Sequence, residues 1–120
     1  MDQISFSDFQ KLDIRIGTVT KAEVPEWSHW VMKLTVDFGK EIGTKTVFSG
    51  IMKFYSPENL EKKQFPFVIN LEPKKIGPEG DFSQGMLLAA DLVEDEAKPE
   101  DGKPILFKLS KKVPNGAKVR

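Results

Sequence analysis

The most regular feature of the sequence is an alternation of apolar and polar residues in short runs. After Asp13, the side chains of Ile14, Ile16 and Thr18 share one face. In residues 30–38 every second side chain is apolar, and this face consists of Trp30, Met32, Leu34, Val36 and Phe38. A period of two is typical of a β-strand with one buried face. Both runs are therefore predicted to be strands. The apolar face of residues 30–38 is predicted to pack in a core.

Turn-forming residues divide the rest of the chain into more short segments. Further strands are predicted at residues 44–51, 65–71, 85–92 and 105–109, with residues 117–119 pairing at the end. Residues 73–81 are rich in glycine and proline and are predicted to form a flexible loop. Gly17, inside the first strand, predicts a bulge or bend.

Two short helical turns are also expected. Ser5 or Ser7 is a candidate N-cap for a turn over residues 8–12. Ser56 is placed to cap a second turn, with Pro57 at its first helical position. The order is then five or more strands with one short helix between the third and fourth. The OB-fold, a five-stranded Greek-key barrel, has this order. Another all-β barrel would give much the same pattern.

Length and composition limit the classes of protein. The 120 residues fit one domain, with a core over about residues 6–92 and a C-terminal extension over residues 93–120. The absence of cysteine excludes disulfides, thiolate metal sites and cysteine nucleophiles. There is no stretch of about 20 apolar residues. The N-terminus lacks the pattern of a signal peptide, so a cytoplasmic location is expected.

The charges are balanced overall but unevenly distributed. The formal net charge is zero, from 18 basic and 18 acidic side chains. Residues 94–101 hold five of the acids and only Lys98 among the bases, which leaves a net charge of +4 on the rest. A local basic face is therefore possible, whereas a strongly positive field around the whole molecule is not.

No group of residues suggests catalysis. His29 is the sole histidine and has no neighbouring nucleophile. The glycine-rich residues 77–85 lack the Gly-Lys-Ser/Thr ending of a phosphate-binding loop. The acidic residues show neither glycosidase nor metal-loop spacing. We therefore expect a protein that is not an enzyme and has no cofactor or metal.

Several segments together resemble the tRNA-binding-domain family. They are residues 9–19 (FQKLDIRIGTV), 49–51 (SGI), 55–60 (YSPENL), 70–76 (NLEPKKI) and 83–90 (SQGMLLAA). The family includes free-standing bacterial tRNA-binding proteins and the C-terminal domains of many methionyl-tRNA synthetases. The resemblance covers about residues 6–92. It implies an OB-fold homodimer that binds structured tRNA and assists aminoacylation in trans, with a synthetase as a further partner.

Other segments are similar to the CsaA-type branch, described as export-related chaperones. They are residues 36–43 (VDFGKEIG) and 76–78 (IGP). Residues 24–30 (VPEWSHW) stand where the tRNA-binding branch often has His-Pro-x-Ala-Asp-Lys-Leu. This similarity implies an alternative function, which is binding of unfolded precursor polypeptides.

The candidate RNA-binding residues combine cations, amides and an apolar contact, as an RNA site requires. They are Lys53, Asn70, Lys74, Lys75, Ser83, Gln84 and Met86, with Arg15 as a weaker candidate. The resemblance implies that the positions from Asn70 to Met86 face the RNA. The alternative is that the lysines are solvated charges and that Asn70 forms a turn.

Two apolar groups suggest other contacts. Trp27 and Trp30 flank His29 and are candidates for stacking a base or gripping a peptide, unless their loop folds back onto the barrel. A homodimer interface is predicted from the apolar residues near both ends, which are Ile4, Phe6, Phe9, Ile105 and Phe107. The alternative is that these residues only cover one end of the barrel.

Overall fold

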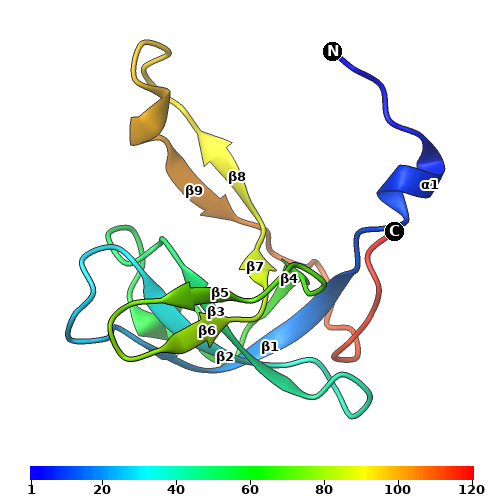
Figure 1. Ribbon diagram of the computed structural model, residues 1–120, viewed down its shortest axis with the longest axis horizontal. Helices are drawn as coiled ribbons and strands as arrows, with labels where there is room; N and C mark the ends of the chain where they lie inside the picture. The colour runs from blue at the N-terminus through cyan, green and yellow to red at the C-terminus, as the bar shows by residue number, and fades with distance from the viewer.

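Five antiparallel strands form the central sheet in the computed structural model, which describes residues 1–120 (Figure 1). In spatial order they are β3 (Thr44–Ser49), β2 (Met32–Asp37), β1 (Ile14–Glu23), β4 (Gln64–Val68) and β7 (Met86–Leu87). The two edges of this sheet meet where Gln84 bonds β3: its backbone N–H donates to the Thr46 carbonyl oxygen at 2.8 Å. The sheet is thereby almost closed into a barrel. The predicted all-β barrel of the OB type is confirmed.

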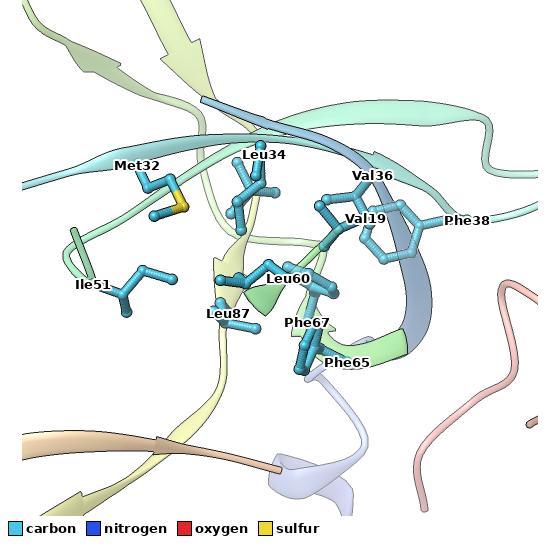
Figure 2. Packing of buried hydrophobic residues seen from close by; sticks show 12 residues of the cluster. Val19, Met32, Leu34, Val36, Phe38, Ile51, Leu60, Phe65, Phe67 and Leu87 are labelled. Atoms are coloured by element: carbon cyan, nitrogen blue, oxygen red, sulfur yellow. The ribbon is translucent and has the colours of Figure 1, made fainter. Parts of the chain in front are cut away.

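The core of the barrel is formed mainly by residues of β1 to β4, together with Phe38, Ile51, Leu60 and Leu87 (Figure 2). Along β2, buried and half-buried residues alternate at every position, as the apolar pattern predicts. The Phe38 and Phe67 rings meet edge to face, with centroids 5.4 Å apart. Trp30 is the exception, because β2 begins only at Met32 and the Trp30 side chain is 56% exposed. Its predicted place in the core is therefore wrong.

Gly17 has a different role from the one predicted. The register of β1 against β2 shifts between Val19 and Lys21, so the irregularity lies after Gly17. A Cβ atom at Gly17 would lie 2.5 Å from Val36 Cγ1 and 2.7 Å from Phe38 Cε1. Glycine is thus needed here because two core side chains pack directly on the backbone.

The two short helical segments differ in how they are held. The 3-10 helix η1 (Pro57–Asn59) follows Ser56, and Pro57 takes its first position as predicted. The Ser56 hydroxyl and the Glu58 backbone N–H lower the pKa of the Glu58 carboxyl from its ordinary value. Helix α1 (Phe6–Phe9) begins two residues before the predicted turn, because the Ser5 hydroxyl accepts a bond from the Asp8 N–H at 3.1 Å. None of the α1 residues is buried.

The predicted loop at residues 73–81 is in part a β-hairpin. Strands β5 (Lys74–Ile76) and β6 (Asp81–Ser83) pair in antiparallel register. Gly77 and Gly80 adopt positive φ angles of 74° and 79° in the turn. The glycines allow the chain to reverse, and pairing then satisfies the backbone groups on both sides. The loop prediction was wrong because it treated these glycines as flexible.

The predicted single strand at residues 85–92 is divided at Leu88. Strand β7 pairs with β4, whereas β8 (Ala89–Leu92) pairs with β9 (Lys103–Leu106). We call β8, β9 and the connecting residues 93–102 the arm. The arm and α1 both extend away from the barrel, on the same side of it in Figure 1. The radius of gyration is 14.9 Å, whereas a compact chain of this length has about 13.6 Å.

The tip of the arm holds the acidic segment and includes the 3-10 helix η2 (Pro99–Asp101). The C-terminal residues return to the barrel and pair with β1. The Ile16 N–H donates to the Ala117 carbonyl and the Val119 N–H donates to the Ile14 carbonyl, both at 2.9 Å. Pairing of residues 117–119 is thus confirmed. None of the helices is both long and apolar enough to cross a membrane.

Candidate nucleic-acid interface

The β5–β6 hairpin carries the two lysines that the sequence places at the RNA-facing side. Lys74 and Lys75 are both exposed. Because they are neighbours in a strand, their side chains point to opposite faces of the hairpin. Lys74 is paired with Ser83, which is buried, and Lys75 is paired with Phe82, which is exposed. Lys75 therefore lies on the outward face, and Lys74 on the face directed toward the barrel.

Phe82 is a candidate that the sequence reasoning missed. Its side chain is 52% exposed and lies opposite Lys75 in the register. A cation beside an exposed aromatic ring offers a phosphate contact and a stacking surface for a base. The alternation of polar, aromatic and polar residues at positions 81–83 could have indicated a short strand that carries Phe82 on one face.

The field around the hairpin is nearly neutral. Residues 72–83 contain two lysines and three acids, Glu72, Glu79 and Asp81. One acid is compensated, since the Lys33 Nζ lies 3.5 Å from an Asp81 carboxylate oxygen. The hairpin can therefore contact phosphates through single lysines, but it does not concentrate positive charge.

Ser83 and Gln84 are engaged in closing the barrel. The Ser83 hydroxyl accepts a bond from the Phe48 N–H at 3.0 Å and donates to the Gly85 carbonyl at 3.1 Å. The Gln84 side-chain oxygen accepts a bond from the Thr46 N–H at 2.8 Å. Both side chains thus join the end of β6 to β3, and their primary contacts are structural.

The Asn70 side chain is also hydrogen-bonded within the protein, whereas the Met86 side chain is exposed. The Asn70 amide accepts a bond from the Asp13 N–H at 2.9 Å and donates to the Lys11 carbonyl at 2.6 Å, which holds the segment before β1. Arg15 is paired with Asp13 of the same segment at 2.6 Å. The Met86 side chain on β7 is 46% exposed and is free to contact a ligand.

The two tryptophans have separate environments. Trp27 packs against Phe48 with ring centroids 6.2 Å apart, and a Cβ atom at Gly77 would overlap its ring. The loop at Trp27 is therefore folded back onto the barrel and supports the β5–β6 turn. Ser28 fixes the loop, because its hydroxyl accepts a bond from the Val31 N–H at 2.9 Å.

Trp30 lies in a hollow of about 560 Å³ between the barrel and the arm. Lys53 and Phe54 line the same hollow, together with Asp91, Glu100 and Asp101. Three carboxylates around one lysine oppose the approach of a phosphate. The structure thus separates Lys53 from the hairpin lysines, although the sequence grouped them in one site.

The predicted dimer residues are exposed. Ile4 and Phe6 are 70% and 71% exposed, and the Phe6 and Phe9 rings stack with centroids 6.4 Å apart. Ile105 and Phe107, at and after the end of β9, are exposed as well. No three side chains among His, Cys, Asp and Glu gather in a way that would hold a metal ion.

An OB-type barrel that presents an exposed lysine and an exposed aromatic ring on the β5–β6 hairpin is typical of a small binding module. Comparison with known families agrees with this class. The family model described as "Putative tRNA binding domain" matches residues 14–118. The chain therefore belongs to the tRNA-binding-domain family, as the sequence resemblance implies.

Individual relatives fall in both branches. The chain is 42% identical over 118 residues to a methionine–tRNA ligase of Archaeoglobus fulgidus, covering 98% of this chain and 16% of the ligase. It is 39% identical to a MetRS-related protein from Pyrococcus horikoshii, with a TM-score of 0.85 and all of both chains covered. The chaperone CsaA from Bacillus anthracis is 34% identical, with a TM-score of 0.79 over 99% of this chain and 100% of the chaperone. The chain thus spans about a sixth of the ligases' length.

Proposed function

We propose that this chain is a non-catalytic module that binds folded tRNA by its shape, acts as a homodimer in the cytoplasm and assists aminoacylation in trans. The observation that carries the proposal is the family match over residues 14–118. The ligase relatives act on tRNA by name, and their similarity covers nearly the whole of this chain. An aminoacyl-tRNA synthetase is therefore the protein partner we propose.

The hairpin supports this function through the type of contact it offers. Lys75 and Phe82 are exposed on one face, where they can meet a phosphate and a base. Polar side chains that could read base edges, namely Asn70, Ser83 and Gln84, are engaged with the protein backbone. Recognition through phosphates rather than base edges gives little sequence preference. This is the behaviour we propose for binding to folded tRNA.

Removal of both hairpin lysines tests the contribution of this site. We predict that Lys74→Ala with Lys75→Ala weakens tRNA binding and flattens the plot of log K against log salt by about two units or less. The reason is the loss of phosphate contacts and of the counterions they release. The matched control is Lys40→Ala with Lys103→Ala, which removes the same charge from exposed positions elsewhere. Equal affinity in the hairpin and control variants would contradict a role for the hairpin.

A second candidate function is binding of unfolded precursor polypeptides. The similarity to the chaperone CsaA and the hollow containing Trp30 and Phe54 favour it. Apolar residues in such a hollow would bury peptide side chains, and this interaction is little screened by salt. The two candidates therefore differ in the salt dependence of binding.

A further inference from the structure

A groove of about 830 Å³ lies between the turn that follows η1 and the segment that follows β9. Four of its 13 lining residues are lysines, and none is acidic. Lys62 and Lys63 come from the turn, and Lys108 and Lys112 come from the C-terminal segment. The four ion pairs of the protein involve Lys11, Arg15, Lys21 and Lys33, and none of the four groove lysines forms one. We call these four residues the lysine groove.

Charge is concentrated here more than at the hairpin. The hairpin segment has three acids for two lysines, whereas the residues that line the groove include four lysines and no acid. Glu58 and Glu61 precede Lys62 in the sequence but are not among the lining residues. No acidic residue follows Asp101 in the sequence. Asp91, Glu100 and Asp101 line the hollow beside Trp30, which shares only Phe54 with the groove. In a chain with no net charge, this separation produces a local positive field.

The backbone at Lys62 supplies a second, independent observation. Lys62 has a φ angle of 66° and is the single non-glycine residue with positive φ. Residues with a Cβ atom are disfavoured in this region, where glycine is the usual choice. Such outliers tend to persist at functional positions. A lysine is thus retained at the groove in a conformation that glycine would adopt more easily.

The walls of the groove are held at a fixed spacing. The Gln64 amide donates to the Val113 carbonyl at 2.6 Å, and its oxygen accepts a bond from the Val113 N–H at 3.1 Å. The Tyr55 hydroxyl donates to the Pro104 carbonyl at 2.8 Å. These bonds join the barrel to β9 and to the C-terminal segment on either side of the groove. The lysines are therefore carried on a preorganised frame, which limits the entropy lost on binding.

We propose that the lysine groove binds the phosphate backbone of RNA, as a contact region in addition to the β5–β6 hairpin. This inference rests on the proposed function and specifies where most of the electrostatic contact lies. Ile105, a predicted dimer residue, also lines the groove, so the RNA site and the proposed dimer interface adjoin. None of the four ammonium groups has a carboxylate partner, although the Lys63 ammonium donates one hydrogen bond to the Asn59 carbonyl at 3.0 Å. Such a group fits a chain of phosphates better than a polypeptide of mixed charge. Lysine, rather than a base-reading side chain, is also suited to contact that does not depend on sequence.

The test compares tRNA affinities of matched variants over a range of salt concentrations. We expect Lys108→Ala with Lys112→Ala to weaken binding about tenfold at low salt and to reduce the salt slope by about two units or less. Lys108→Arg with Lys112→Arg should retain affinity because the charge is kept. The control Lys40→Ala with Lys103→Ala should stay within about twofold of the original chain.

Lys62→Gly protects the test against loss of folding. Glycine adopts a positive φ angle without the steric strain of a Cβ atom, so the melting temperature of this variant should equal or exceed that of the original chain. Its tRNA affinity should fall about threefold, because one positive charge is removed. If both groove variants bind tRNA like the control, the lysine groove is not an RNA site. If the Lys108/Lys112 variant loses affinity for an unfolded polypeptide but keeps its affinity for tRNA, the groove belongs to the polypeptide. If the original chain does not bind tRNA at all, the proposed function itself is wrong.

Discussion

At the scale of single residues, the interface depends on which side chains remain free after folding. Lys75 and Phe82 face outward together, while Ser83 and Gln84 are bonded to β3. A side chain that already bonds the backbone must break that bond before it can contact RNA, and the loss costs about 1–3 kcal/mol. Free exposed residues are therefore the better candidates for affinity.

Phe82→Ala tests the stacking contact. Base–aromatic stacking contributes about 1–3 kcal/mol per base, so this change should weaken tRNA binding by roughly tenfold. The salt slope should remain constant, because no charge is removed. The measurement is a binding titration at several salt concentrations, with Val24→Ala as an exposed apolar control. A change in slope without a change in affinity at low salt would show that Phe82 does not stack a base.

The residue types of the candidate site were predictable, and their partners were not. Trp27 illustrates the limit, since it packs on Phe48 and under Gly77, which lie far away in the sequence. Asn70 is fixed in the same way by the segment before β1. Such contacts arise only when strands distant in the sequence are brought together, and short-range patterns carry no information about them.

At the scale of elements, the structure depends on the junction between β3 and the end of β6. No regular strand ladder joins β3 to this segment. Instead, β3 is hydrogen-bonded to the Ser83 hydroxyl and to the backbone and side chain of Gln84. Side chains replace the missing backbone pairing, which would otherwise leave buried N–H groups unsatisfied. The junction also sets the position of the hairpin, since β6 leads directly into it.

Ser83→Ala tests the structural role of this serine. The change leaves the Phe48 N–H without its partner in a buried position, so the free energy of unfolding should fall by about 1–3 kcal/mol. Chemical denaturation measures the effect, and Ser110→Ala, at an exposed position, is the matched control. Unchanged stability of Ser83→Ala combined with weaker tRNA binding would instead assign this hydroxyl to the RNA.

Alternation was sufficient to predict most strands but not their partners. Residues 85–92 form an apolar run, and nothing in it marks Leu88 as the place where pairing passes from β4 to β9. The change of partner occurs where the pairing of β7 with β4 ends, and this point is set by the closure of the barrel and not by the local sequence. Gly77 and Gly80 correctly indicated that the chain turns in residues 73–81. The pairing of β5 with β6 on either side of the turn was not predicted, although the positive φ angles of these glycines permit a tight hairpin.

At the scale of the whole molecule, the arm and α1 leave apolar side chains exposed away from the barrel. A four-residue helix without any buried residue has little stability of its own. Phe6 and Phe9 stack on each other and are exposed, and a contiguous exposed apolar patch often marks an interaction surface. This is the physical basis for the proposed homodimer.

Phe6→Ser with Phe9→Ser tests the homodimer. The original chain should have about twice the monomer mass of 13.5 kDa in light scattering, and the variant should have the monomer mass. Loss of apolar area from the interface is the cause. Phe82→Ser, which changes an exposed phenylalanine on the hairpin, should remain a dimer. A monomeric original chain would contradict the proposal.

The central claim is that an overall neutral chain binds folded tRNA through local positive charge. The most direct test is one pair of titrations of the original chain, with total tRNA and with an unfolded polypeptide, each at low and high salt. The account predicts tight tRNA binding that is lost as salt rises, because counterions are released from the phosphates. Polypeptide binding that resists salt, without affinity for tRNA, would contradict it.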